Sequence, residues 1–276
     1  MKEGAYDYIL KDSLQRLPNA VLHAMDSYTL EVERQKFLNE VIETEALKKS
    51  LKKISDFVQH ASHELRTPLA TMLLQTESAL RKELTTEEAK KVLESLKEEQ
   101  MKIIDLTNSL LLLSQFESGH YLSHWPKLRI EELLYDSIEE AKKMYPDINI
   151  SFNFLKYPEE ESYLYLRGNE TLLHIAFSNL IKNAYLYSDN KHAIIILEAQ
   201  SNVIYLHFEN KGQVLKTEDK EKIFLPFRRG ENAQQKKGSG LGLSIVTRIA
   251  ELHKGTVNYQ VVNHNINRFT LSFFTQ

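Results

Sequence analysis

Apolar residues recur at intervals of three and four from residue 54 to about residue 81, and again from about residue 86 to residue 116. This spacing places apolar side chains on one face of a helix, so it predicts two long amphipathic helices. Thr85-Thr86 followed by Glu87-Glu88 is typical of the cap and first turn of the second helix. The charged residues 1–51 favour a connecting helical segment.

The two predicted helices are joined by a short loop and therefore form a hairpin. Their apolar stripes are wider than a single partner helix can cover, and two copies of the hairpin would bury them as a four-helix bundle. We therefore predict a homodimer that forms through residues 54–116.

Beyond Ser118-Gly119, which are expected to end the second helix, the pattern changes to short alternating strands and helices. Strands are expected near residues 126–130, 148–155, 162–167, 192–199, 202–209, 255–262 and 268–275. Helices are expected near residues 131–144, 169–187 and 240–254. The predicted fold class is α+β, with a helical hairpin followed by an α/β sandwich whose mixed sheet carries helices on one face. The predicted domains are 1–51, 52–118 and 119–276.

Composition narrows the possible functions. The 276 residues are 42% hydrophobic, which is enough for a buried core. The net charge of -3, with basic residues spread among acidic ones, gives no basic surface for nucleic acid. The chain has no cysteine, which excludes disulfides and thiolate chemistry. Because no apolar run approaches the roughly 20 residues that span a bilayer, we expect a soluble chain with no membrane segment.

The first predicted helix contains His63-Glu-Leu-Arg-Thr-Pro-Leu69, which concentrates reactive groups. An imidazole can attack a phosphoryl group near neutral pH if a neighbour takes its proton, and Glu64 is the natural partner of His63. Pro68 removes a main-chain hydrogen bond to the carbonyl of Glu64 and predicts a local hinge. A metal site formed by His60 and His63 is an alternative, but no third ligand follows with zinc-protease spacing.

Two further motifs indicate phosphate binding. Gly238-Ser-Gly-Leu-Gly242 precedes a predicted helix, where glycines let main-chain N–H groups approach phosphate, although by itself it is equally a flexible turn. Asn179 and Asn183 are four residues apart and so share a helical face. Their oxygens suit a Mg²⁺ ion that also binds nucleotide phosphates, although an isolated pair is more often solvated or capping. The irregular segment 212–240 is long enough to favour a functional lid.

Four motifs in this order resemble those of the histidine kinases of bacterial two-component signalling. The ATP-binding domain of that family is of the kind shared with gyrase, Hsp90-type chaperones and MutL. The resemblance spans about residues 52–276. Residues 63–69 match the phospho-acceptor motif, 179–183 the asparagine motif, 224–229 the phenylalanine motif and 238–242 the second glycine motif.

The resemblance implies a protein histidine kinase that uses ATP to phosphorylate itself on His63. It would then pass the phosphoryl group to an aspartate of a response regulator receiver domain. By the same resemblance, Glu64 would be the base or orienting acid for His63, and Thr67 would position the water that dephosphorylates the partner. The family also implies a homodimer and a cytoplasmic location, either as a soluble kinase or as the cytoplasmic part of a membrane-anchored sensor.

The resemblance also implies the nucleotide contacts. Asn183 would bind Mg²⁺, Asn179 would contact phosphate or a Mg²⁺-bound water, and Tyr187 would pack beside adenine. Arg229 would be the phosphate-contacting arginine of the lid, whose Phe224 and Phe227 are expected to be hydrophobic anchors. The main-chain cradle would consist of Gly238, Gly240, Leu241 and Gly242.

Three positions depart from the family pattern. Asn210, followed by Gly212, stands where an aspartate usually accepts the adenine amino hydrogens, although an amide carbonyl can accept the same bond without the charge. Leu186 stands where a phosphate-binding lysine often follows the asparagine motif, and Asn169 stands where an aspartate often precedes this helix. The missing cation would have to come from Arg228, Lys182 or a lysine of the lid.

These departures keep an alternative open. The chain could be a degenerate nucleotide-binding signalling scaffold, or a phosphatase-biased member that acts through Thr67 with weak kinase activity. An ATP-driven clamp related to Hsp90 or MutL is a third interpretation. It shares the nucleotide-binding fold but leaves the helical hairpin with His63 unexplained.

Overall fold

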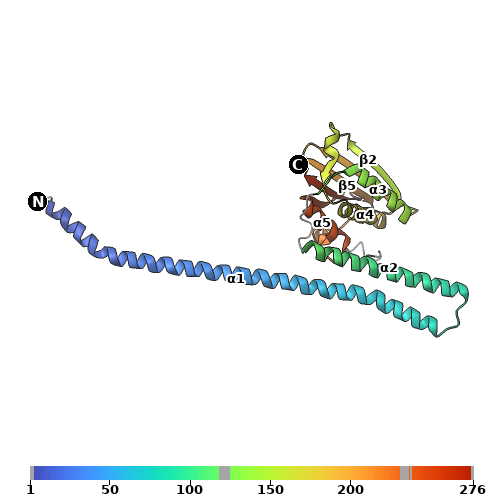
Figure 1. Ribbon diagram of the computed structural model, residues 1–276, viewed down its shortest axis with the longest axis horizontal. Helices are drawn as coiled ribbons and strands as arrows, with labels where there is room; N and C mark the ends of the chain where they lie inside the picture. Colours follow the sequence, from blue (N-terminus) through green and yellow to red (C-terminus); the bar gives the residue numbers. More distant parts are fainter. Residues whose placement is uncertain (1–2, 118–124, 231–235, 237, 275–276) are drawn as a thin grey trace. The chain divides into compact units, whose positions relative to one another are not determined.

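The computed structural model describes residues 3–117, 125–230, 236 and 238–274, with side chains from residue 28 onward (Figure 1). The chain divides into two compact units, residues 1–59 and 60–276. The described part of the first unit is helical throughout and belongs to α1 (Glu3–Leu80). The side chains of residues 28–56 are exposed, as expected for a connecting helix that has no core of its own.

The hairpin of the second unit consists of the C-terminal part of α1 and of α2 (Thr86–Glu117). Both predicted helices are therefore present. A reciprocal pair of hydrogen bonds begins α2: the Glu88 main-chain N–H donates to Thr85 Oγ1 at 3.3 Å, and the Thr85 N–H donates to Glu88 Oε2 at 2.9 Å. This capping box satisfies two N–H groups that a helix start would otherwise leave without partners.

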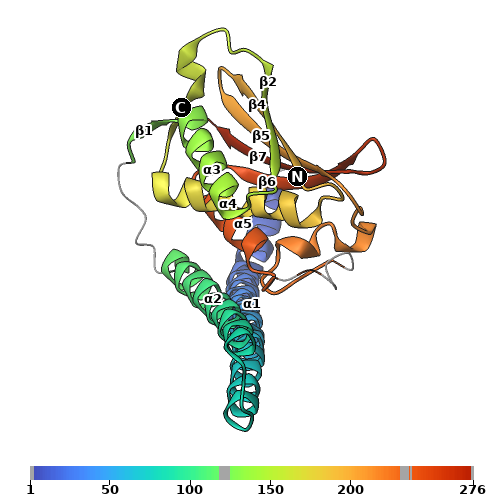
Figure 2. The same ribbon diagram turned by 90° about the vertical axis from the view of Figure 1, so that its right-hand side faces the viewer.

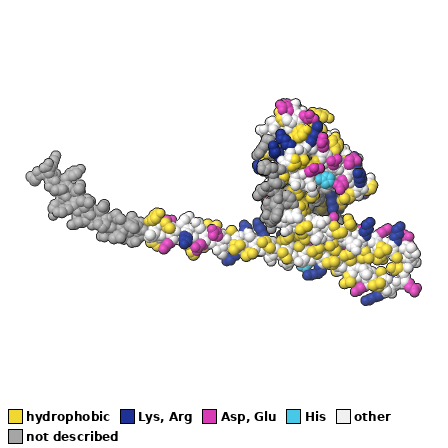
Figure 3. Space-filling model, viewed as in Figure 1, with side chains coloured by type: hydrophobic (Ala, Val, Ile, Leu, Met, Phe, Trp, Pro, Cys, Tyr) yellow, Lys and Arg dark blue, Asp and Glu magenta, His cyan; other side chains and the backbone are white. Residues whose placement is uncertain are grey.

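One face of the hairpin is buried and another is apolar but exposed. Leu106, Phe116 and Pro68 are buried. The helix continues through Pro68, and the predicted hinge at this residue stays a prediction. Figure 3 shows hydrophobic side chains along the hairpin. The large exposed ones in the hairpin are Leu69, Leu73, Leu74, Leu80, Leu93, Met101, Ile104 and Leu111.

The C-terminal part alternates helices and strands as the pattern predicts. Its helices are α3 (Ile130–Met144), α4 (Glu170–Tyr187) and α5 (Gly242–Leu252). Its strands are β1 (Lys127–Arg129), β2 (Asn149–Lys156), β3 (Tyr165–Arg167), β4 (His192–Gln200), β5 (Val203–Lys211), β6 (Thr256–Val262) and β7 (Ile266–Phe274). Short 3₁₀ turns cover Glu161–Leu164, Thr217–Asp219 and Lys222–Phe224.

Two of the element bounds that differ from the predictions have local reasons. Part of the strand expected at 162–167 is a 3₁₀ turn, which is closed by a hydrogen bond from the Tyr163 N–H to the Glu160 carbonyl (3.1 Å). The helix expected from residue 240 begins at Gly242, because Gly240 has a φ of 74°, which a right-handed helix does not allow. The predicted domain boundary at 118/119 lies outside the described residues, so the domain limits stay predictions.

Five strands form a mixed sheet in the order β2-β4-β5-β7-β6. Strand β2 runs parallel to β4, and the other neighbours are antiparallel. Helices α3, α4 and α5 lie together on one face of this sheet (Figure 2). The predicted α+β class and the mixed sheet with helices on one face are confirmed. Strands β1 and β3 form a separate antiparallel pair.

The core lies between the sheet and the helices. Ile195 and Leu197 of β4 are fully buried and alternate with half-buried residues, as the period of two in a one-sided strand requires. Phe177 of α4 and Phe208 of β5 are also buried, with ring centroids 6.2 Å apart. Each fully buried side chain of this size contributes about 1.5–3 kcal/mol. This packing fixes α4, which carries both asparagines of the candidate site.

Candidate functional site

A cavity of 990 Å³ lies in the unit formed by residues 60–276. It is bounded by the hairpin, by α4 and α5, and by the segment that precedes α5. The hairpin contributes Glu64 and Thr67 to its wall. The predicted nucleotide contacts that line it are Asn179, Asn183, Tyr187, Asn210, Arg229, Gly238, Gly240 and Gly242. Residues from four separate sequence motifs are thus brought to one cavity.

Three of the predicted site residues do not line the cavity. His63 is exposed, and its main-chain carbonyl accepts a hydrogen bond from Thr67 Oγ1 at 3.1 Å. Consecutive residues of an α-helix point about 100° apart, so Glu64 can face the cavity while His63 does not. Gly212 follows β5 and donates its N–H to the Asn265 carbonyl at 3.0 Å. Leu241 is buried in the core directly before α5.

Asn169 has a structural role at the start of α4. Its side-chain Oδ1 accepts a hydrogen bond from the Leu172 N–H at 3.0 Å, which makes it the N-cap. Asparagine caps a helix about as well as the aspartate that often stands here, so this departure costs α4 little. The Asn169 N–H donates in turn to Nε2 of the buried His253 at 3.0 Å.

The asparagines of α4 face the glycine-rich turn. Asn179 donates from Nδ2 to the Ile175 carbonyl at 2.9 Å, and this directs its Oδ1 away from that carbonyl. A Cβ at Gly242 would lie 2.7 Å from Asn179 Oδ1, so only glycine lets the turn approach this closely. Asn183 is half-buried one helical turn further along the same cavity wall.

Asn210 is almost completely buried, at 2% exposure, and its orientation is fixed. Its Nδ2 donates to the main-chain carbonyl of Tyr187 at 2.8 Å. Because a carbonyl can only accept, the amide nitrogen must face Tyr187 and Oδ1 must face away from it. Asn210 lines the cavity, and its Oδ1 is therefore an acceptor for a ligand. An aspartate has no donor and could not make the same bond to Tyr187.

Residues that the sequence analysis missed support Asn210 from β5 and β7. Glu209 and Arg268 form a largely buried ion pair, with Arg268 donating from Nε. Asn267 is buried, lines the cavity and accepts a hydrogen bond from the Tyr259 hydroxyl at 2.7 Å. The sequence signal for Asn267 and Arg268 was that two consecutive polar residues occur in β7, a strand whose other residues are mostly apolar.

Within the segment 212–240, which is predicted to be a lid, Phe227 contacts the core. This residue is half-buried, packs against the core and has a φ of 60°, in the left-handed region. Its ring stacks on that of His60 with centroids 5.7 Å apart. A Cβ at Gly240 would lie 2.9 Å from the main-chain carbon of Phe227. Phe224 is half-buried, and Arg229 donates from Nη2 to the Lys236 carbonyl.

Helix α2 adds polar groups to the cavity that the sequence analysis also missed. Lys102, Asp105 and Ser109 line the cavity and are spaced by three and four residues. Lys182 of α4 places its Nζ 3.6 Å from Asp105 Oδ2. Burial, and after it the charge of Asp105, raises the pKa of Tyr145. The available signal was the three-and-four spacing of these polar residues, which places them on one face of α2.

The donor set fits Mg²⁺ held jointly with phosphates and not an ion held by the protein alone. Among the described residues, no three or more His, Asp or Glu side chains are grouped so that they could hold a metal ion. Mg²⁺ usually keeps several waters and takes only one or two protein ligands, which Asn183 and Asn179 can supply.

Comparison with known protein families accounts for both parts of the site. Residues 53–119, which include His63, match the His Kinase A (phospho-acceptor) domain. Residues 168–275 match the ATPase domain of the histidine kinase, DNA gyrase B and HSP90 type. The chain belongs to the histidine kinase family. The order of the two domains is the order in which the sequence motifs occur.

Two relatives illustrate this histidine kinase membership. The chain is 31% identical over 227 residues to the sensor histidine kinase HprS of Escherichia coli. The matched region covers 82% of this chain and 49% of HprS. It is 31% identical over 234 residues to the heme sensor protein HssS of Staphylococcus haemolyticus, covering 83% of this chain and 49% of HssS. The chain thus spans about half the length of these relatives.

Solved histidine kinase structures share the fold. The Acinetobacter baumannii histidine kinase AdeS matches with a TM-score of 0.61 at 21% identity, over 78% of this chain and 98% of that one. The histidine kinase ThkA, solved in complex with the response regulator protein TrrA, matches with a TM-score of 0.59 at 21% identity, over 83% and 64%. Within the described part of this histidine kinase, every helix is too short or too polar to cross a membrane.

Proposed function

We propose that this chain is the kinase part of a sensor histidine kinase in a two-component system. It would phosphorylate itself on His63 with ATP and transfer the phosphoryl group to an aspartate of a response regulator. The observation that carries this proposal is the shared cavity. Asn179 and Asn183 of the ATP-binding domain line the same space as Glu64 and Thr67 of the phospho-acceptor motif.

The nucleotide would be held by groups that line the cavity. Asn210 Oδ1 is an acceptor for the adenine amino group, and Tyr187 packs beside the base. Arg229 and the main-chain N–H groups of the turn 238–242 bind phosphate at the start of α5. Asn183, with Asn179, provides neutral oxygen ligands for Mg²⁺. Mg²⁺, when bound, neutralises phosphate charge and orients the phosphoryl group for transfer.

In the proposed reaction, a ring nitrogen of His63 forms a bond to the γ-phosphorus of ATP. The bond from that phosphorus to the bridging oxygen breaks, and ADP leaves with the electron pair. Glu64 accepts the proton that the imidazole loses. Because His63 lies outside the cavity, transfer requires either a movement of the ATP-binding domain along the hairpin or a His63 from a second protomer.

The hairpin provides surfaces for two protein partners. Its exposed leucines and isoleucine are suited to pairing with a second hairpin, so we propose a homodimer in the form of a four-helix bundle. The exposed His63 is accessible to a response regulator, and the ThkA complex with TrrA supports a partner of this kind. Thr67 would position water when the same surface acts as a phosphatase. ATP and such regulators are cytoplasmic, and so, we propose, is this chain.

The orientation of Asn210 favours a kinase over a degenerate scaffold. Loss of the usual aspartate would weaken adenine binding only if no acceptor replaced it. The hydrogen bond to Tyr187 holds the amide with its oxygen available, so the main adenine contact is retained without a charge.

The test is incubation of the purified chain with Mg-ATP labelled at the γ-phosphate. We expect acid-labile, base-stable label that His63→Gln abolishes. His60→Gln, at a second histidine of the same helix, is the control and should retain the label. Addition of receiver domains encoded nearby should then move the label to an aspartate. Unlabelled protein under conditions where a nucleotide analogue binds would overturn the kinase proposal in favour of the scaffold.

A further inference from the structure

Among the residues that helix α4 contributes to the cavity, Asn179, Lys182, Asn183 and Leu186 form a stripe. They are spaced i, i+3, i+4 and i+7, which places all four on one face of the helix. Leu186 stands where a cation would be expected, at the end of the stripe. Lys182 lies one helical turn before it and is the only cation of the stripe.

The partner of Lys182 is an acid on the hairpin. Its Nζ lies 3.6 Å from Asp105 Oδ2 of α2, and the two side chains are 44% and 62% exposed. Ion pairs this exposed contribute little to stability, and a lysine ammonium on its flexible stem can turn to a new partner. Lys102, the cation that α2 itself brings to the cavity, is paired with the less exposed Glu99.

We propose that Lys182 is a second phosphate-binding cation of this site, besides Arg229, in place of the lysine that is missing at residue 186, and that Asp105 is the counter-ion which phosphate must displace. The inference rests on the nucleotide function proposed above and assigns within it a role that Leu186 cannot fill. On nucleotide binding, the Lys182 ammonium would leave the Asp105 carboxylate and bind the oxygens of the triphosphate, which carries more negative charge than the carboxylate. Nucleotide binding therefore weakens the ion pair between α4 and α2, and the ion pair weakens nucleotide binding by the same free energy.

Equilibrium binding of AMP-PNP with Mg²⁺, measured by calorimetry on the full chain, tests this role. Lys182→Gln should weaken binding about tenfold, as expected for the loss of one charged hydrogen bond. Asp105→Asn should tighten binding, by up to about fivefold, because the lysine no longer has to leave a carboxylate. In the double variant the effect of Asp105→Asn should vanish, since Asp105 acts only through Lys182.

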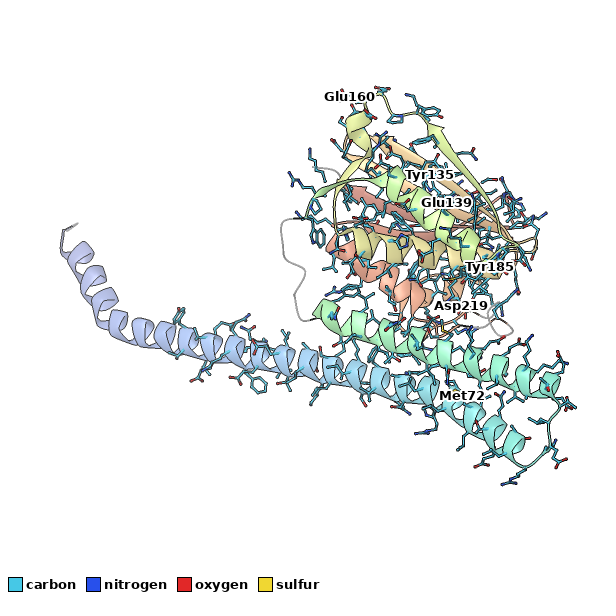
Figure 4. All side chains as sticks on the ribbon, turned by 45° about the vertical axis from the view of Figure 1, so that its right-hand side comes forward. Met72, Tyr135, Glu139, Glu160, Tyr185 and Asp219 are labelled. Carbon is cyan, nitrogen blue, oxygen red and sulfur yellow. The ribbon has the colours of Figure 1, made fainter. Side chains whose placement is uncertain are left out.

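The chain offers a matched control pair on α3. Lys142 and Glu139 form an ion pair whose side chains are 48% and 61% exposed, almost the same as for Lys182 and Asp105. Neither residue lines the cavity, and Glu139 is labelled in Figure 4. Lys142→Gln and Glu139→Gln should leave AMP-PNP binding unchanged.

Two further measurements separate a phosphate contact from a general loss of structure. Lys182→Gln should bind adenosine, which has no phosphate, with wild-type affinity. Leu186→Lys added to Lys182→Gln should restore AMP-PNP binding, because it returns a cation to the same helical face one turn later. Matching thermal unfolding temperatures would confirm that each variant is folded.

The inference is overturned if Lys182→Gln binds AMP-PNP as the wild type does. It is equally overturned if Asp105→Asn weakens binding, or if its effect persists when Lys182 is absent. A wild-type chain that binds no AMP-PNP would overturn the proposed function together with this inference. Wild-type binding that is indifferent to Lys182 would overturn the inference alone.

Discussion

Asn210 of β5 donates a hydrogen bond from Nδ2 to the main-chain carbonyl of Tyr187, at 2.8 Å, and so ties the sheet to the C-terminal end of α4. The same bond decides which atom of the amide is left for a ligand. It therefore links the stability of the domain to the chemistry of the cavity.

Restoring the aspartate that is usual in the family should destabilise this chain. Asn210→Asp removes the donor and places a carboxylate against the Tyr187 carbonyl in a buried position. We expect the free energy of unfolding to fall by about 1–3 kcal/mol, as measured by urea denaturation. Asn153→Asp, at an exposed position on β2, is the control and should change little. Equal stability of the two variants would show that the Tyr187 contact is dispensable.

The glycines of the turn should differ in their tolerance of a methyl group. Gly242→Ala would bring a Cβ to 2.7 Å from Asn179 Oδ1 and so displace the side chain that donates to the Ile175 carbonyl. AMP-PNP affinity should fall by up to about tenfold, since one hydrogen bond and the phosphate approach are disturbed. A Cβ at Gly238 would meet no protein atom within 4 Å, so Gly238→Ala should weaken binding less than Gly242→Ala. Identical affinities for the two variants would contradict the steric argument.

Stability should decrease on acidification through His253. Burial lowers the pKa of His253, although a main-chain hydrogen bond to Ile249 partly opposes this. The unfolded chain, with the ordinary histidine pKa near 6.5, therefore takes up the proton first as the pH falls. The contribution of neutral His253 to the free energy of unfolding is complete above about pH 6.5. It is lost as the pH falls toward the lowered pKa of His253 in the folded protein.

The measurement for His253 is the free energy of unfolding at several pH values between 7.5 and 5. Its decrease on acidification should be smaller in His253→Gln than in the wild type, because glutamine does not titrate. An unchanged dependence on pH would rule out this role for His253. The stacked Trp125 ring, 4.3 Å away between centroids, offers a fluorescence signal for the same transition.

The proposed homodimer should depend on the exposed leucines of the hairpin. Leu73 and Leu111 are 61% and 59% exposed, and a charge at either would be buried without a partner in a bundle. Leu73→Glu and Leu111→Glu should each convert the dimer to a monomer in sedimentation experiments. Leu155→Glu, at a residue 62% exposed on β2, should leave the dimer intact. A wild-type chain that is already monomeric at high micromolar concentration would contradict the four-helix bundle.

The sequence by itself determined the elements and the face that each motif occupies. The three-and-four spacing predicted α2 and the hairpin. Within one helix the helical repeat fixes which side chains are neighbours, so spacing along the chain is sufficient to assign a face. The same rule put Asn179 and Asn183 on one face of α4. The motif order predicted His63 as the phospho-acceptor and the glycine turn as a phosphate contact, although the capping role of Asn169 was not expected.

Only the tertiary structure decided which of these residues meet. The pairing of Lys182 with Asp105 joins helices that are distant in sequence, and it depends on how side chains of separate elements pack. The orientation of the Asn210 amide depends on a carbonyl of α4, and no property of the residue itself sets it. His63 outside the cavity and Glu64 within its wall follow from how the hairpin faces the other domain. Spacing along the chain cannot encode such relations, because they arise only when separate elements pack.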